Sequence, residues 1–491
     1  MKHRTDPSLA GRGTGRRVAP KAPTAAAHPA TPRHAQGATT QRGLNDKIAW
    51  MAIGDLTPFP GNPRRHPEDQ IARLMRNIDR VWTNPILIDE TATILAGHAR
   101  LEAARRLGRT EVPTLTIAGL STAEKRAMVI ADNRLPEQAV WDFDLLRGHF
   151  KDLIDLDCDV ELTGFSTGEI DLLMDGKPVP AGDDPADDLT GLSEGPAVSL
   201  PGDVWQLGRH RLVCGDARRG SAYEMLLQGE LAQMIVADPP YNVRINGHAV
   251  GRGKTRHREF AMASGEMSEE AFTAFLEGFI RQAITFSANG SIHYLFIDWR
   301  HLHELLAAAR PLYDEWKNLL VWNKTNAGQG SFYRSKHELI AVFKNGAAPH
   351  VNNFGLGANG RYRANVLDYP GVNCLHPARR GELDLHPTVK PVALVADLIR
   401  DCSRRNGIIF DPFGGSGTTI LAADRAGRIA RVIELDPLYV DVAIGRWEQT
   451  TSIPARHAEL GLTFAETAAT RGINEVHCSE PRPHQGWREQ A

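Results

Sequence analysis

The sequence predicts an α/β protein whose larger, C-terminal half is built on a mostly parallel sheet, with a smaller α+β domain before it. An apolar strand at 233–237 ends directly in Asp-Pro-Pro-Tyr (238–241). A second strand, at 407–411, runs into a glycine turn, a helix and another strand. Buried strands and strand–helix–strand units are typical of parallel sheets. Short strands and helices over 46–136 predict the smaller domain.

Composition describes a globular protein and argues against several classes. The chain has 491 residues, of which 42% are hydrophobic and 24% are charged, enough for several domains with full cores. Its five cysteines include no CxxC pair, which disfavours a zinc ribbon, an iron–sulfur protein or a disulfide scaffold and fits a reducing cytoplasm. No apolar run approaches the roughly 20 residues that span a bilayer, and secretion is not expected, because the first residues contain no hydrophobic h-region. We expect a cytoplasmic protein with no membrane partner.

Residues 1–45 are predicted to be a disordered basic tail. They are rich in Ala, Pro, Gly and Thr and carry eight Lys or Arg residues against one acid. Two interpretations stay open: a solvated tail, or a basic arm that raises non-specific DNA affinity by counterion release. The net charge of the whole chain is only −2, so nucleic-acid contacts must come from local basic patches.

The smaller domain, 46–136, alternates strands and helices. Apolar residues at helical spacing predict a helix over 70–78, and a glycine at 108 ends the helix predicted after the second strand pair. The expected elements, in order, are a strand and turn at 53–58, a helix at 70–78, strands at 85–89 and 93–96, a helix at 101–107, a strand at 112–117 and a helix at 122–131.

A Gly-His-Ala-Arg turn (97–100) joins a strand to a helix in this domain, whose layout resembles the ParB/sulfiredoxin-like domain. The resemblance implies that Gly97 and Arg100 hold the phosphates of a nucleotide at the helix start, where backbone amides and an arginine fork suit anions. His98 and Ala99 replace the acid and base of the family's turn. A glycine turn with an exposed arginine is the alternative.

Residues 137–199 are predicted to be a connector. Apolar residues at helical spacing indicate mixed helices up to about 175. Asp, Gly and Pro then dominate 178–196, a composition typical of an acidic linker.

The larger domain, 200–450, is predicted from apolar strands and intervening helices. Strands are expected at 204–208, 210–216, 233–237, 292–297, 319–323, 337–344, 407–411 and 429–435, with helices at 222–227, 275–286, 392–400 and 420–425. Residues 451–491 are interpreted as a C-terminal tail with a short helix at 464–469.

The Asp-Pro-Pro-Tyr segment suits chemistry on the exocyclic amine of a base. Such an amine is a poor nucleophile, and two acceptors on its hydrogens can aim its lone pair at an electrophile. Asp238 supplies a carboxylate and Pro239 a carbonyl in a stiff segment, while Tyr241 offers a face for stacking a base taken out of the helix. The alternative is a strand end with a capping Asp and a rigid turn.

The glycine turn predicts an adenosine-containing ligand. Phe-Gly-Gly-Ser-Gly (413–417) follows a strand and opens a helix, and Glu434 ends the next strand about 20 residues later, as ribose recognition requires. The spacing differs from the GxGxxG that cradles a pyrophosphate and suits S-adenosylmethionine better.

A third motif, His-Pro-Thr-Val-Lys-Pro (386–391), precedes a helix. Thr388 and Lys390 near a helix N-terminus could hold a carboxylate, and a proline-flanked helix cap is the alternative.

Together the three motifs resemble the β group of DNA amino-methyltransferases, over about 200–450. The resemblance implies a Rossmann-like class I S-adenosylmethionine-dependent methyltransferase fold with a circularly permuted motif order. Its catalytic residues are then Asp238, Pro239, Pro240 and Tyr241. It also implies cofactor contacts to the adenine (Asp216), the carboxylate (Thr388, Lys390), the methionine part (Phe413, Gly415, Gly417) and the ribose (Glu434), with Asp411 orienting the turn.

The resemblance implies a site-specific methyltransferase that acts on N6 of a flipped adenine in double-stranded DNA by direct in-line attack. Asp at the head of the motif favours adenine over cytosine N4, which is the first alternative. A DNA- or nucleotide-binding regulatory protein with a vestigial methyltransferase half is the second, and a nicotinamide dehydrogenase the third. A homodimer, the recognition site and a cognate restriction enzyme are left open.

Basic residues in two irregular segments are candidates for DNA contact, with a solvated charge run as the alternative for the first. They are Arg252, Lys254, Arg256 and Arg258 in the first segment and Arg361 and Arg363 in the second.

Methyl transfer from a sulfonium requires no metal, and His301 and His303 have no third ligand at metal-binding spacing. We expect no metal site.

Overall fold

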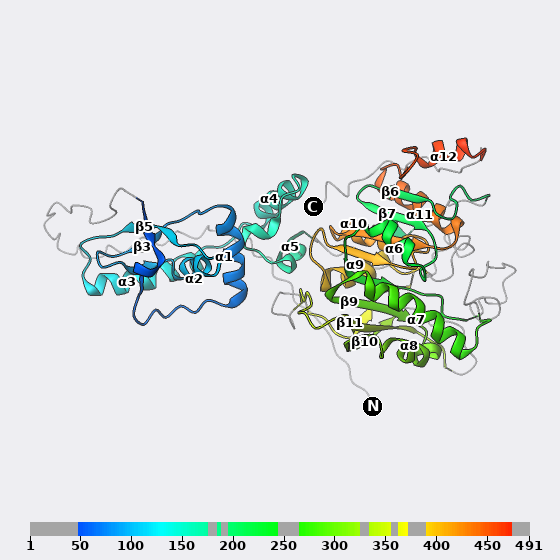
Figure 1. Cartoon of the computed structure of the whole chain (residues 1–491), viewed down its shortest axis with the longest axis horizontal. Coiled ribbons are helices and arrows are strands. Elements are labelled where there is room, and N and C mark those ends of the chain that lie inside the picture. The colour runs from blue at the N-terminus through cyan, green and yellow to red at the C-terminus, as the bar shows by residue number, and fades with distance from the viewer. Residues whose placement is uncertain are drawn as a thin grey trace, which may run out of the picture. The chain divides into compact units, whose positions relative to one another are not determined.

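The structure is a computed structural model that describes residues 48–174, 184–187, 195–243, 265–324, 333–354, 362–371 and 389–473. The chain divides into two compact units, 1–71 with 78–137 and 72–77 with 138–491 (Figure 1). Each is described by itself. Among the described residues, none of the helices combines the length and apolar character that crossing a bilayer requires.

The first unit is a five-stranded mixed sheet in the order β1-β5-β3-β4-β2. Its core is aliphatic and includes Ile86, Ile94, Leu101 and Val112. A capping box, in which Ser121 and Glu124 bond each other's backbone N–H, begins its last long helix. The elements are β1 (Ala49–Ala52), β2 (Thr57–Pro58), α1 (Glu68–Arg80), β3 (Ile86–Ile88), β4 (Thr93–Ala96), α2 (His98–Arg106), β5 (Glu111–Thr116) and α3 (Thr122–Arg134). The predicted helices and strands are confirmed, and the strand and turn predicted at 53–58 are the short strand β2 and the 3-10 turn η1 (Ile53–Asp55).

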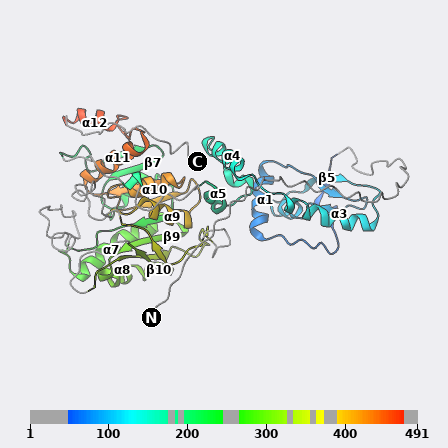
Figure 2. The same ribbon diagram turned by 180° about the vertical axis from the view of Figure 1, so that it is seen from behind.

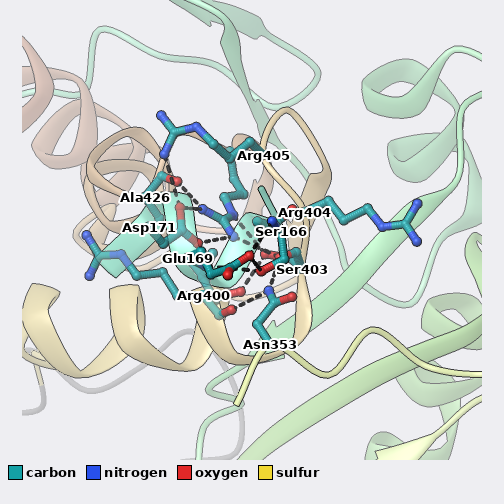
Figure 3. Close-up of polar contacts among 12 residues, drawn as sticks. Ser166, Glu169, Asp171, Asn353, Arg400, Ser403, Arg404, Arg405 and Ala426 are labelled. Atoms are coloured by element: carbon teal, nitrogen blue, oxygen red, sulfur yellow. Dashed lines mark hydrogen bonds and ion pairs between the residues drawn. The ribbon is translucent and has the colours of Figure 1, made fainter. Parts of the chain in front are cut away.

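A small helical cluster opens the main part of the second unit. It contains α4 (Phe143–Asp155), the 3-10 turn η3 (Val160–Thr163) and α5 (Thr167–Met174), which pack around Phe150 and Ile170. Asp171 on α5 is buried and accepts two bonds from Arg428, at 2.9 and 2.7 Å, and one from Arg405 at 3.1 Å (Figure 3). This buried ion pair fixes α5 to the rest of the unit.

The second unit is built on a ten-stranded sheet in the order β12-β10-β11-β9-β8-β13-β14-β7-β6-β15. The central strands β9, β8, β13, β14 and β7 are mutually parallel, and β11 runs antiparallel beside β9. The strands are β6 (Val204–Leu207), β7 (His210–Cys214), β8 (Ala232–Ala237), β9 (Ser287–Ile297), β10 (Glu315–Asn323), β11 (His337–Lys344), β12 (Val366–Asp368), β13 (Ile408–Asp411), β14 (Ile429–Glu434) and β15 (Arg456–His457). The predicted α/β class with a mostly parallel centre is confirmed.

Helices cover both faces of this sheet (Figures 1 and 2). Successive residues of β13 point to opposite faces of the sheet. Ile409 packs in the hydrophobic cluster with α9, α10 and α11, whereas Ile408 and Phe410 pack in the cluster with α6, α7 and α8. The helices are α6 (Gly220–Leu227), α7 (Glu269–Thr285), α8 (Leu302–Ala309), α9 (Val392–Cys402), α10 (Thr418–Arg425), α11 (Pro437–Thr451) and α12 (Phe464–Thr470).

Several features were not predicted. β1, α11, β12 and β15 have no counterpart among the expected elements, and β15 pairs with β6 so that part of the expected tail extends the sheet. Within the expected acidic linker, Asp184 and Ala186 are buried, at 5% and 2% exposure, around the 3-10 turn η4 (Pro185–Asp187). Residues 1–45 lie outside the described residues.

Candidate active site

The Asp-Pro-Pro-Tyr segment and the glycine turn lie at one edge of the sheet. β8 and β13 are neighbouring parallel strands, with Ile235 opposite Phe410. Their carboxyl ends therefore face the same edge, where ligands bind in open α/β sheets. Asp238 follows β8 directly, and Asp411 is the last residue of β13. Two segments far apart in the sequence thus contribute to one site.

The glycine turn is organised by Asp411 and by close packing on α11. The Asp411 carboxylate accepts the backbone N–H of Phe413 at 2.9 Å and the hydroxyl of Thr419 at 2.5 Å. Gly417 begins α10 with a φ of 81°, and a Cβ there would lie 2.8 Å from the Cβ of Ala443. Only glycine fits this position without displacing α11.

Glu434, the last residue of β14, ties its strand to the turn. One carboxylate oxygen accepts the N–H of Gly415 and the other the N–H of Asp436, both at 2.8 Å. Burial raises the pKa of Asp411 and of Glu434 to about 7. Both carboxyls bond neutral donors, so a ligand with a positive charge or hydroxyl groups would stabilise their charged forms.

These raised pKa values predict how stability depends on pH. Both carboxyls bind protons more tightly in the folded state, where the pKa is about 7, than in the unfolded chain, where it is about 4. The contribution of these two carboxyls to the free energy of unfolding should therefore fall as the pH rises from about 4 to about 7. Buried His293, whose pKa is lowered to about 3, contributes in the opposite direction. Urea unfolding across this range measures it. Glu434→Gln removes one of the two groups, so the free energy of unfolding of the wild type should fall relative to that of the variant over this range; a difference between the two proteins that does not change with pH contradicts the prediction.

A buried charge cluster surrounds Asp238. One Asp238 oxygen accepts the Tyr241 hydroxyl and the other the ammonium of Lys390, both at 2.5 Å. Glu338, on β11, lies 3.2 Å from the Tyr241 hydroxyl and 3.2 Å from the Lys390 nitrogen. Lys324 also pairs with Glu338. Two carboxylates and two ammonium groups thus compensate one another.

The cluster separates the acidities of its two carboxyls. Burial raises the pKa of Asp238; Lys390 opposes this rise and Glu338 adds to it. Burial also tends to raise the pKa of Glu338, but the ammonium groups of Lys390 and Lys324 outweigh this effect and lower the pKa of Glu338 to about 2. Burial and the two carboxylates raise the pKa of Tyr241 well above its ordinary value, so its hydroxyl stays a donor. Asp238 is therefore the carboxyl that takes up a proton more readily.

Sequence reasoning missed Glu338 and expected a different neighbour for Lys390. Glu338 stands second in an apolar strand, and an acid in such a run is the signal that could have marked it. Lys390, expected near a cofactor carboxylate, has its side chain on Asp238 and Glu338, while its carbonyl accepts the Thr418 hydroxyl at 3.3 Å. Lys390 therefore links the catalytic segment to the start of α10.

The remaining predicted cofactor and catalytic residues also lie near strand ends. Asp216 follows β7 and pairs with Arg218 at 2.8 Å. Phe413 packs edge-on against Phe279, with 4.9 Å between ring centroids. Pro239 is buried and Pro240 is half-buried. Thr388 lies outside the described residues.

Of the predicted DNA-contacting residues, Arg363 alone lies among the described ones. Its guanidinium bonds Asp401 at 2.8 Å and Asp397 at 3.2 Å, and its side chain is 16% exposed. A role in DNA binding would require it to exchange these partners, and that role stays a prediction. Arg252, Lys254, Arg256, Arg258 and Arg361 lie outside the described residues.

The Gly-His-Ala-Arg turn of the first unit begins α2 as expected. Gly97 has a φ of 102°, and the Arg100 guanidinium lies 3.3 Å from where a Cβ on Gly97 would stand. Arg100 is half-buried rather than exposed. The ring of His98 accepts the backbone N–H of Phe59 at 3.1 Å, so the residue that departs from the family's turn holds a neighbouring loop.

His303, on α8, lies in a group of potential metal ligands that sequence spacing did not reveal. His301 ends the 3-10 turn before α8. Glu269, at the start of α7, comes together with His303 and Glu304, and their ligand atoms lie within 4.8 Å of one another. The buried Glu304 is already bonded by His301 at 2.8 Å, and Glu269 and His303 are exposed. His301 is not a member of this group, and the expectation that no metal is bound stays a prediction.

Comparison with known proteins assigns both parts of the chain. A sequence model of the N6/N4 family, described as DNA methylase, matches residues 232–445. The ParB-like nuclease domain-containing protein YnaK of Escherichia coli (strain K12) is 40% identical over 81 residues, which are 16% of this chain and 93% of that protein. The chain joins a ParB-like domain to an N6/N4 DNA methylase.

Further similarities were found. A model described as the ParB-methyltransferase HTH domain matches residues 144–201 of the methylase, where helices and a linker were expected. Type II methyltransferase M.ScaI of Streptomyces caespitosus is 38% identical over 89 residues, 18% of this chain and 29% of that protein. The M1.HpyAVI–SAM complex is 20% identical with a TM-score of 0.36, covering 48% of this chain and 97% of that one. Methylases of the N6/N4 family take their methyl group from S-adenosylmethionine.

Proposed function

We propose that this methylase transfers a methyl group from S-adenosylmethionine to N6 of adenine in double-stranded DNA, at a base flipped out of the helix. The observation that supports this most is the pairing of β8 with β13, because it brings the segment suited to an exocyclic amine beside the glycine turn. The expected attack is direct and in line, without a covalent enzyme intermediate.

The residues present fit the cofactor. The turn at Gly414–Gly417 carries little side-chain bulk, and the neighbouring carboxyls of Asp411 and Glu434 have a raised pKa that a cationic, hydroxyl-bearing ligand would lower. S-adenosylmethionine, when bound, supplies an electrophilic methyl group on a sulfonium. Glu434 would hold its ribose, Phe413 and Gly415 would border its methionine part, and Asp216 would lie by its adenine.

The protein's own contribution is to hold and orient the base. Asp238 accepts one N–H of the amine and the carbonyl of Pro239 accepts the other, which directs the nitrogen lone pair at the methyl group. The ring of Tyr241 stacks on the base. To reach Asp238 the amine displaces either the Tyr241 hydroxyl or Lys390, its two partners in the free protein. Asp238, whose pKa is raised, is placed to receive the proton that the amine loses.

Glu338 should set the pH at which Asp238 works. Glu338→Gln removes a negative charge that raises the pKa of Asp238, so the acid side of the rate profile should move to lower pH. Single-turnover methylation measured against pH tests this. An unchanged profile, with normal cofactor affinity, would show that Glu338 does not act on Asp238.

The identity of the methylated base decides the specificity. The purified chain is incubated with labelled S-adenosylmethionine and mixed duplex DNA, and the DNA is then digested to nucleosides. N6-methyladenine is expected. N4-methylcytosine would assign the alternative specificity, and no labelled nucleoside would reject the enzymatic proposal. Nucleotide binding at Gly97 and Arg100 and a homodimer remain predictions.

A further inference from the structure

A four-residue segment before the methylase sheet contacts the helices that form the cofactor side of the site, and its residues Asp184 and Ala186 are buried. We call residues 184–187 the strap. Asp184 receives both terminal nitrogens of Arg425, at the end of α10, at 2.5 and 2.8 Å. The Asp184 carboxylate also accepts the backbone N–H of Ala186 at 3.0 Å, and this bond folds the strap into a turn. A segment rich in acids is thus held by a buried ion pair.

Arg446 of α11 connects the strap to the glycine turn. Its Nε and Nη2 donate to the carbonyl of Ala186 at 2.8 and 2.7 Å. Its Nη1 donates to the carbonyl of Ser416 at 3.2 Å, to the Ser416 hydroxyl at 3.0 Å and to the Thr418 hydroxyl at 2.9 Å. The side chain is 1% exposed. One guanidinium therefore bonds both segments at once, from a position that water hardly reaches.

The strap also holds the helix that follows Lys390. Asp187 accepts the N–H of Val392, the first residue of α9, at 2.9 Å, and lies 3.6 Å from Arg446. The Thr418 hydroxyl that Arg446 bonds donates in turn to the carbonyl of Lys390. The strap, the glycine turn and the segment carrying Lys390 form one connected network.

We propose that Arg446 is a positioning residue for S-adenosylmethionine and that the strap is a built-in part of the cofactor site. The network fixes the turn at Ser416 from behind, so the binding conformation exists before the cofactor arrives. This inference depends on the proposed function in one respect, the identity of the ligand as S-adenosylmethionine.

The test compares two buried arginines in the full chain. Arg446→Lys keeps the positive charge but not the fork that bonds both segments, and should weaken S-adenosylmethionine binding about tenfold while kcat at saturating cofactor changes little. Arg428→Lys is the matched control, because Arg428 is equally buried and bonds Asp171 and Ser403 rather than the turn. Equilibrium dialysis with the labelled cofactor and thermal unfolding are measured for both.

The expected result is a large rise in Kd for Arg446→Lys and an unchanged Kd for Arg428→Lys at a similar loss of stability. An unchanged Kd for Arg446→Lys, or an equal rise in both variants, overturns the proposal. Thr418→Val, which removes one acceptor of Arg446, covers the case in which Arg446→Lys does not fold, and should also raise Kd. Wild-type protein that binds the cofactor but methylates no DNA would reject the proposed function and leave this test intact.

The strap itself is tested by a second pair. Asp184→Asn weakens the bond to Arg425 and should raise Kd for the cofactor about threefold, whereas Asp171→Asn, on α5, should not. Equal cofactor Kd values in Asp184→Asn and the wild type would remove the strap from the cofactor site.

Discussion

Asp238→Ala should reduce methyl transfer by about a thousandfold or more while leaving S-adenosylmethionine bound with nearly wild-type affinity. The carboxylate belongs to the end of β8 and to the cluster with Tyr241 and Lys390, not to the glycine turn. Its loss therefore removes the acceptor for the target amine without altering the cofactor's turn. Single-turnover transfer to duplex DNA and cofactor titration measure the two effects separately.

Asp298 offers a matched control for this variant. It follows β9, the strand parallel to and beside β8, and its side chain accepts the N–H of Arg300 at 3.0 Å. Asp298→Ala should lose a cap and little activity. If both aspartate variants lose methyl transfer equally, the negative charge at this edge of the sheet, rather than the position of Asp238, determines the activity. If Asp238→Ala retains activity, the proposed mechanism is wrong.

Gly417→Ala should weaken S-adenosylmethionine binding at least about thirtyfold, because the new Cβ meets Ala443 and the turn must shift. Its Cβ would lie 2.8 Å from the Ala443 Cβ and 3.2 Å from its Cα, and the residue has a φ of 81° that alanine adopts at a cost. Isothermal titration with the cofactor measures the loss.

Gly427, just after the other end of α10, provides a control that distinguishes backbone strain from an effect on cofactor binding. It too has a positive φ, 68°, but a Cβ there meets only the flexible guanidinium of Arg405. Gly427→Ala should therefore cost about 1 kcal/mol of stability and leave cofactor affinity unchanged. Comparable losses of affinity in both glycine variants would mean that the turn is sensitive to the stability of α10 alone.

The catalytic edge could be predicted because its residues follow recognisable strands. Asp238 and Asp411 each end an apolar run, and a parallel sheet places such ends together. The neighbours in the sheet could not be predicted, since pairing of β8 with β13 depends on contacts across the whole domain. Glu338 was missed for the same reason: it enters the cluster through β11, whose antiparallel register against β9 no local pattern defines.

The strap was misjudged because its composition resembles that of a solvated linker. Asp, Pro and Gly are frequent in exposed segments, and the arginines that pair with Asp184 and Asp187 come from helices more than 200 residues further along the chain. α11 was missed because its buried face is interrupted by charged residues such as Arg446, whose partners only the fold reveals.

The pairing of β8 with β13 also has a consequence for biosynthesis. β8 ends at Ala237 and β13 begins at Ile408, so β8 acquires its second sheet neighbour only after the long stretch between them has been synthesised. Until then, β8 has an unpaired edge, and such an edge is slow to find distant partners and prone to aggregate. The nascent chain should accordingly lack catalytic capacity until β13 has been synthesised. A chaperone that shields β8 during elongation should improve the yield of active enzyme.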